Sequence, residues 1–170
     1  NVDADFVLGW LKADRKRSPQ YSFEHCPKLL EEFWPLYLST LQRGKALPFH
    51  LAEFINDRNP QLQKKYGKSI LSLLSAKNID AAINGAAVLT DNLNLIKGNE
   101  PLLIEALQGR RNYYVQQQII YALGRVRYKN ESFKKILLEL LGKKNLAPAC
   151  HFALCQMEDN EKLRRTYLSG

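Results

Sequence analysis

The chain has little of what would indicate a disulfide framework, a membrane span or a β-sheet. Its three cysteines are an odd number and too few for a disulfide framework, which favours reduced thiols inside the cell. No apolar run approaches the roughly 18 residues that a membrane-spanning helix needs, and no segment shows the alternation of a hairpin-forming strand. We therefore expect an all-α, cytoplasmic protein without membrane insertion. The chain begins at Asn1 rather than at methionine, so the sequence leaves open whether a targeting segment was removed.

Basic residues are in excess. Lysine and arginine number 25 against 17 aspartate and glutamate residues, which gives a formal net charge of +8. Such an excess suits an acidic partner, whether protein, nucleic acid or lipid headgroup, and does not choose among them. A soluble domain with no acidic partner can carry the same charge.

Leucines recur in two interleaved series. The first series is Leu89, Leu123 and Leu154, spaced 34 and 31 residues apart and preceded each time by small, aromatic or aliphatic residues. The second series is Leu74, Leu107 and Leu141, spaced 33 and 34 residues apart. A period of this length with two helical segments in it is typical of helical hairpins stacked into an α-solenoid.

Apolar periodicity and turn residues predict the individual elements. Residues 1–46 do not follow the period and are predicted to form a two-helix N-terminal cap, and residues 47–170 form the repeat array as one continuous domain. Helices are predicted at 47–57, 61–76, 78–89, 100–107, 112–126, 133–141, 146–157 and 160–168. Asn78 and Asn112 are the expected N-caps, and Gly142 is the expected left-handed residue after the helix that ends at Leu141.

The segment from Tyr113 to Val126 resembles the first helix of a HEAT-like repeat of the short bacterial kind. Such helices have a valine near the start, a polar run, and an Ala-Leu-Gly close followed by a basic and an aliphatic residue. The matching residues here are Val115, Ala122, Leu123, Gly124, Arg125 and Val126. The resemblance covers about residues 47–168 and implies a short right-handed solenoid of about four hairpins. HEAT-like proteins serve as scaffolds, enzyme accessory factors, toxin antagonists and occasionally DNA-repair enzymes, so the resemblance implies binding without naming a chemistry.

Some of the basic residues recur with the repeat and are the candidate contact residues. One row comes directly after the second helix of successive predicted hairpins: Lys77, Arg110, Arg111, Lys143 and Lys144. A second group lies within the second helices, which usually line the concave face of HEAT-like arrays: Lys64, Lys65, Lys134, Lys135, Arg164 and Arg165. For the first row, stabilisation of helix C-termini by cations is an alternative explanation. Cations inside a helix gain nothing from the dipole, which favours an anionic partner for the second group.

No catalytic or metal-binding constellation can be assembled from the sequence. Gly67-Lys68-Ser69 resembles the end of a P-loop, but Leu62 stands where that motif needs glycine. Cys150 and Cys155 point in different directions on one helix, which is unsuitable for a zinc site and typical of small core residues. We therefore predict a protein that is not an enzyme and has no metal or cofactor.

The sequence favours a protein-protein interaction module that binds an acidic partner protein, as a scaffold, a regulator or a toxin antagonist. The alternative is a nucleic-acid-binding HEAT-like protein of the DNA-repair type that uses a basic concave face. Tyr113, Tyr114, Tyr121 and Tyr128 lie close in sequence to arginines, which suits stacking on bases. However, the repeats contain no tryptophan, which the HEAT-like glycosylases use to hold damaged DNA.

Overall fold

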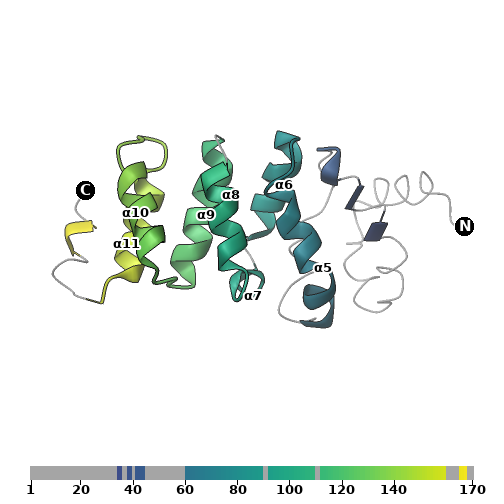
Figure 1. The fold of residues 1–170 in the computed structure, drawn as a ribbon, viewed down its shortest axis with the longest axis horizontal. Helices are drawn as coiled ribbons and strands as arrows, with labels where there is room; N and C mark the ends of the chain where they lie inside the picture. Colours follow the sequence, from purple (N-terminus) through teal and green to yellow (C-terminus); the bar gives the residue numbers. More distant parts are fainter. Residues whose placement is uncertain are drawn as a thin grey trace, which may run out of the picture.

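The described part of the chain is all-helical. The computed structural model describes residues 34–35, 38–39, 41–44, 60–89, 92–109, 112–159 and 165–167, and these contain no strand. The helices follow one another along the long axis of the molecule (Figure 1). They are α5 (Pro60–Leu73), α6 (Ile79–Leu89), α7 (Leu93–Ile96), α8 (Glu100–Gly109), α9 (Tyr113–Arg125), α10 (Glu131–Leu140) and α11 (Ala147–Met157). The predicted all-α class is confirmed.

Asparagine side chains define the starts of three helices. Asn78 accepts a hydrogen bond from the backbone N–H of Asp80 at 2.9 Å at the start of α6. Asn112 accepts from Val115 N at 3.1 Å at the start of α9, and Asn130 accepts from the backbone N–H of the third residue of α10 at 3.0 Å. Each bond satisfies a donor that the first helical turn leaves without an intrahelical partner. The caps predicted at Asn78 and Asn112 are confirmed.

The helices pack in chain order. Helix α6 packs on α9 and α9 packs on α11, while α5 contacts α6, α8 contacts α9 and α10 contacts α11. Each of these contacts therefore joins helices that are consecutive along the chain or begin about 34 residues apart. In the view of Figure 1, α8 and α10 lie in front of α9 and α11.

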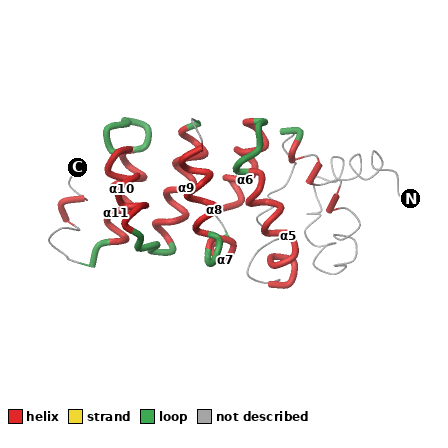
Figure 2. Tube along the Cα trace, viewed as in Figure 1, coloured by secondary structure: helices red, strands yellow, loops and turns green. Residues whose placement is uncertain are grey.

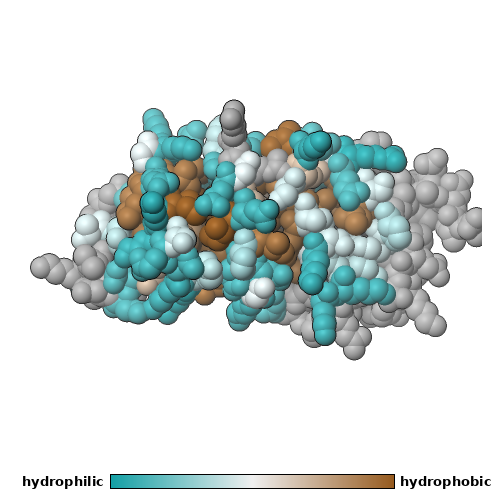
Figure 3. All heavy atoms as spheres, viewed as in Figure 1, coloured by the Kyte–Doolittle hydropathy of each residue, from teal (hydrophilic) through white to brown (hydrophobic). Residues whose placement is uncertain are grey.

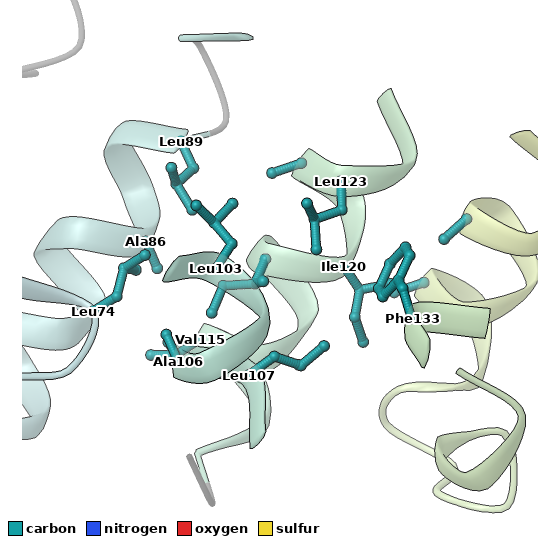
Figure 4. Close-up of a cluster of buried hydrophobic side chains, with 14 of the residues drawn as sticks. Leu74, Ala86, Leu89, Leu103, Ala106, Leu107, Val115, Ile120, Leu123 and Phe133 are labelled. Carbon is teal, nitrogen blue, oxygen red and sulfur yellow. The ribbon is translucent and has the colours of Figure 1, made fainter. Parts of the chain in front are cut away.

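Both predicted leucine series contribute to one core. Leu89, Leu123 and Leu154 are buried in the same hydrophobic cluster, as are Leu74 and Leu107, and Leu141 packs against it half-buried. Figure 4 shows Leu89 of α6, Leu103 of α8 and Leu123 of α9 directed into a shared interior. Leucines from helices about 30 positions apart in sequence therefore share one core.

Two glycines allow helices to approach closely. A Cβ at Gly85 in α6 would lie 2.9 Å from Leu73 Cβ and 3.3 Å from Ile70 O, both in α5. A Cβ at Gly124 in α9 would lie 3.0 Å from Ala153 Cα in α11. At both positions the absence of a side chain sets the separation of the helices.

Helix ends differ from the sequence prediction in two places. The short helix α7 lies between the predicted helices 78–89 and 100–107, where no helix was predicted. It forms because Leu95 and Ile96 are buried and hold the chain against the core. Gly142 does not have the expected left-handed conformation. Among the described residues other than glycine, Arg127 has this conformation, with φ of 52°, after α9.

The turn at Arg127 has the hydrogen bonds of a Schellman motif. Tyr128 N donates to Leu123 O at 3.1 Å and Arg127 N donates to Gly124 O at 2.9 Å. Tyr128, the residue that follows, packs half-buried against the core. This apolar contact and the paired hydrogen bonds hold an arginine in a conformation that favours glycine.

Several predictions lie outside the described residues. The N-terminal cap, residues 1–46, is described only at a few positions, of which Trp34 stacks on Tyr66 of α5 with ring centroids 4.1 Å apart. The helix predicted at 47–57 is wholly outside, and the one at 160–168 is described as helical only at 165–167. Among the described residues, no helix has the length and apolar character to cross a membrane.

Candidate binding surface

The turns that lead from α5 to α6 and from α10 to α11, together with the start of α9, lie along one edge of the molecule. Figure 2 shows the turns at 74–78 and 141–146 and the start of α9 at the upper edge, with the turn at 126–130 at the lower one. Lys77 lies in the first upper turn, and Lys143 and Lys144 lie in the second, all exposed. The structure therefore places these three lysines on the same edge, as the 33-residue spacing predicted. Arg110 and Arg111 of the same predicted row lie outside the described residues.

Exposed apolar side chains begin the first helices at this edge. Tyr113 is the first residue of α9 and is 58% exposed, and the next residue, Tyr114, is 39% exposed. Ile79 holds the first position of α6 and is 40% exposed. Because α6 packs on α9, residues in the same position of these two helices are neighbours along the edge. We call Lys77, Ile79, Tyr113, Tyr114, Lys143 and Lys144 the edge surface.

Among the residues that the structure describes, one acidic side chain, that of Asp80, lies beside this surface. Asp80 is exposed at the second position of α6, where its carboxylate is favourably placed at the positive end of the helix dipole. The three lysines outnumber it. The edge surface with Asp80 therefore has a net positive charge and an apolar centre.

Helices α5, α8 and α10, which correspond to the predicted second helices of the hairpins, carry charges of both signs. Helix α5 presents three exposed lysines, Lys64, Lys65 and Lys68, and no acidic residue. Helix α8, which follows along the chain, adds Glu100 and exposed Glu105. Helix α10 adds exposed Lys135 and half-buried Lys134, accompanied by exposed Glu131 and Glu139. The lysines predicted to form a basic face are thus separated by carboxylates, and the face is not uniformly basic.

Apolar side chains also reach the surface of the second helices. Leu102 of α8 is 47% exposed and Leu138 of α10 is 49% exposed. Figure 3 shows apolar surface in the middle of the molecule, with hydrophilic side chains along both long edges. Arg165 of the predicted face is exposed, and Arg164 lies outside the described residues.

The lower edge contains an ion pair that sequence inspection missed. Lys129, in the turn after α9, donates a hydrogen bond to the Asp159 carboxylate beyond α11. That hydrogen bond and the lysine charge lower the pKa of Asp159 below its ordinary value, and Arg127 adds a smaller effect in the same direction. Lys129 and Asp159 are 30 residues apart, close to the period of the leucine series, and this spacing was the sequence signal from which the pair could have been predicted.

The tyrosines divide between core and surface. Tyr121 and Tyr128 are half-buried and pack against the core, and Tyr121 contacts the ring of Phe152 with centroids 5.4 Å apart. Tyr113 and Tyr114 are exposed. Of these four tyrosines, Tyr113 and Tyr114 are therefore the two that offer most ring surface to a partner.

The two cysteines of α11 are buried, as predicted. Burial raises the pKa of the Cys150 thiol to about 11, so it stays protonated at neutral pH and is a poor nucleophile and metal ligand. Within the described part of the chain, no cluster of histidine, cysteine and carboxylate side chains is arranged to hold a metal ion.

Comparisons with family models, curated proteins and solved structures find no match for this chain.

Proposed function

We propose that this chain is a HEAT-like α-solenoid that binds an acidic partner protein and is not an enzyme. The proposal includes a right-handed array of about four hairpins behind a two-helix cap. It is supported by the order of helix contacts, in which α6, α9 and α11 pack in series while α5, α8 and α10 alternate with them along the chain. Each hairpin then contacts mainly its neighbours, which is the defining property of a solenoid.

The edge surface carries the functional proposal. It combines exposed lysines with exposed tyrosine and isoleucine side chains, and none of these is needed to fill the core. Tyrosine is enriched at the energetic centres of protein interfaces, and exposed positive charge steers an acidic partner towards them. A scaffold, a regulator and a toxin antagonist are all compatible with such a surface. A cytoplasmic location is part of the proposal and rests on the reduced cysteines.

The mixed charge of the second helices makes the nucleic-acid alternative less favourable. A groove that follows a phosphate backbone needs a continuous track of cations. Glu105 on α8 and Glu131 and Glu139 on α10 are exposed among the lysines that would form this track. The carboxylates would repel phosphates, whereas a protein partner can present lysines to them.

Two charge-reversal variants test which surface binds. The edge variant carries Lys77→Glu, Lys143→Glu and Lys144→Glu. The matched variant carries Lys64→Glu, Lys65→Glu and Lys135→Glu on the second helices, with the same change in net charge. Immobilised wild-type protein and both variants are incubated with extract of the source cell, and bound proteins are quantified by mass spectrometry, with and without nuclease.

We expect the wild type and the second-helix variant to retain the same acidic protein and the edge variant to lose it. Equal retention by all three proteins would show that the basic edge is not the contact surface. Material that disappears on nuclease treatment, together with oligonucleotide binding that weakens steeply with salt, would support the nucleic-acid alternative instead.

A further inference from the structure

We infer that the edge surface binds an extended segment of its partner in which two acidic residues flank an apolar one. This inference rests on the proposed function and deepens it, because it states what kind of polypeptide lies on the edge. Three observations carry it: the lysines lie at both ends of the surface, Tyr113 and Tyr114 lie between them, and the helices that carry these residues pack in series.

The order of residues along the edge follows from helix packing. Lys77 immediately precedes α6, Tyr113 begins α9, and Lys143 and Lys144 precede α11. Helix α9 packs on both α6 and α11, so Tyr113 and Tyr114 lie between the two groups of lysines. The apolar centre is thus bounded by positive charge on both sides.

The spacing sets the length of the segment. Packed helices lie about 8–10 Å apart, so two such steps separate the lysine groups by about 16–20 Å. An extended chain advances about 3.3 Å per residue, so about five or six residues bridge this distance. The complementary segment therefore carries carboxylates about five or six residues apart, with a large apolar side chain near the middle to pack on Tyr113.

The exposure of Tyr113 and Ile79 explains why the bound segment should carry an apolar residue near its middle. Tyr113 is 58% exposed and Ile79 is 40% exposed, although both begin helices whose following turns are well buried. Covering an aromatic ring and an aliphatic side chain removes apolar area from water, which lysine pairing alone does not do. Asp80 lies beside the Lys77 end of the surface and would repel a carboxylate over the start of α6. The acidic residue of the segment is therefore expected over Lys77.

The test starts from a random library of 12-residue peptides displayed on phage and selected on the wild-type protein. The affinities of the enriched peptides, labelled with a fluorophore, are then measured by fluorescence anisotropy. The first variant carries Tyr113→Ser and Tyr114→Ser. Its matched control is Leu102→Ser, which removes a comparably exposed apolar side chain from α8. The edge variant defined above completes the set.

We expect enriched peptides with acidic residues five or six positions apart around a large apolar residue. Their affinity should fall at least about tenfold in the tyrosine variant and in the edge variant, and by less than about twofold in Leu102→Ser. Circular dichroism of each variant establishes that it is folded.

Other outcomes overturn the inference. If the peptides are acidic without an apolar residue and bind the tyrosine variant normally but not the edge variant, the extended apolar mode is wrong while the proposed basic surface stands. If the edge variant binds them as well as the wild type, both the inference and the placement of the proposed site fail. If no peptide is enriched although the edge-dependent protein is retained from extract, the partner does not bind through an extended segment.

Discussion

Substitution of Gly124 by alanine tests the packing of α9 against α11. A Cβ at this position would lie 3.0 Å from Ala153 Cα, 3.2 Å from Ala153 Cβ and 3.0 Å from Phe152 Cε1, all in α11. The first of these atoms is backbone and cannot turn aside. The added methyl group must therefore push α9 and α11 apart or bend one of them.

Two opposing effects set the magnitude. Overpacking of a close contact typically costs about 1–3 kcal/mol, and replacing glycine by alanine inside a helix gains about 0.5–1 kcal/mol. We therefore expect Gly124→Ala to lower the free energy of unfolding by about 1 kcal/mol. For a chain of 170 residues this corresponds to a decrease in Tm of about 2–4 °C.

Gly109→Ala is the matched control. Gly109 is the last residue of α8, and a Cβ there would have no heavy atom within 4 Å. The same substitution should leave stability unchanged or raise it by up to about 1 kcal/mol. Urea unfolding followed by far-UV circular dichroism measures both variants. If Gly124→Ala were as stable as Gly109→Ala, α9 and α11 would not be in the close contact described here.

Three further predictions concern helix ends and the core. Arg127→Gly should raise the free energy of unfolding by about 0.5–1 kcal/mol because it relieves the left-handed conformation, whereas Arg127→Ala, which removes the charged side chain but keeps Cβ, should not; urea unfolding distinguishes them. Asn112→Ala should lower stability by about 1 kcal/mol through loss of the cap on Val115 N, and Asn112→Ser should recover most of it in the same assay. The raised pKa of Cys150 means that its thiol ionises more readily in the unfolded chain, so stability should fall between about pH 9 and about pH 11, and less so in Cys150→Ala; parallel Tm curves for the two proteins would contradict this.

Much of the described helical structure could be predicted from local sequence. The predicted helices 78–89, 112–126 and 146–157 correspond closely to α6, α9 and α11, because their apolar residues have a helical period and asparagine precedes two of them. Helix α7 was missed because four residues are too short to show a period, and only burial of Leu95 and Ile96 stabilises it.

The candidate surface was predicted less completely. The sequence spacing grouped Lys77 with Lys143 and Lys144, and the turns that carry these lysines lie at the same edge of the molecule. Attention to cations alone overlooked Glu139, which shares α10 with the lysines and makes that surface mixed. The exposure of Tyr113 could not be predicted, because a tyrosine in a helical pattern suits the core and the surface equally well.

The sequence by itself determined the longer helices and the burial of most leucines of the two series, because period, caps and turn residues act within a few positions of the chain. Only the tertiary structure decided how closely Gly124 brings α9 to α11 and which residue takes the left-handed turn. It also showed that Lys129 reaches Asp159. The helix contact and the ion pair join residues about 30 positions apart, and the turn at Arg127 is held by the packing of half-buried Tyr128 against the core. All three depend on how side chains from different helices pack.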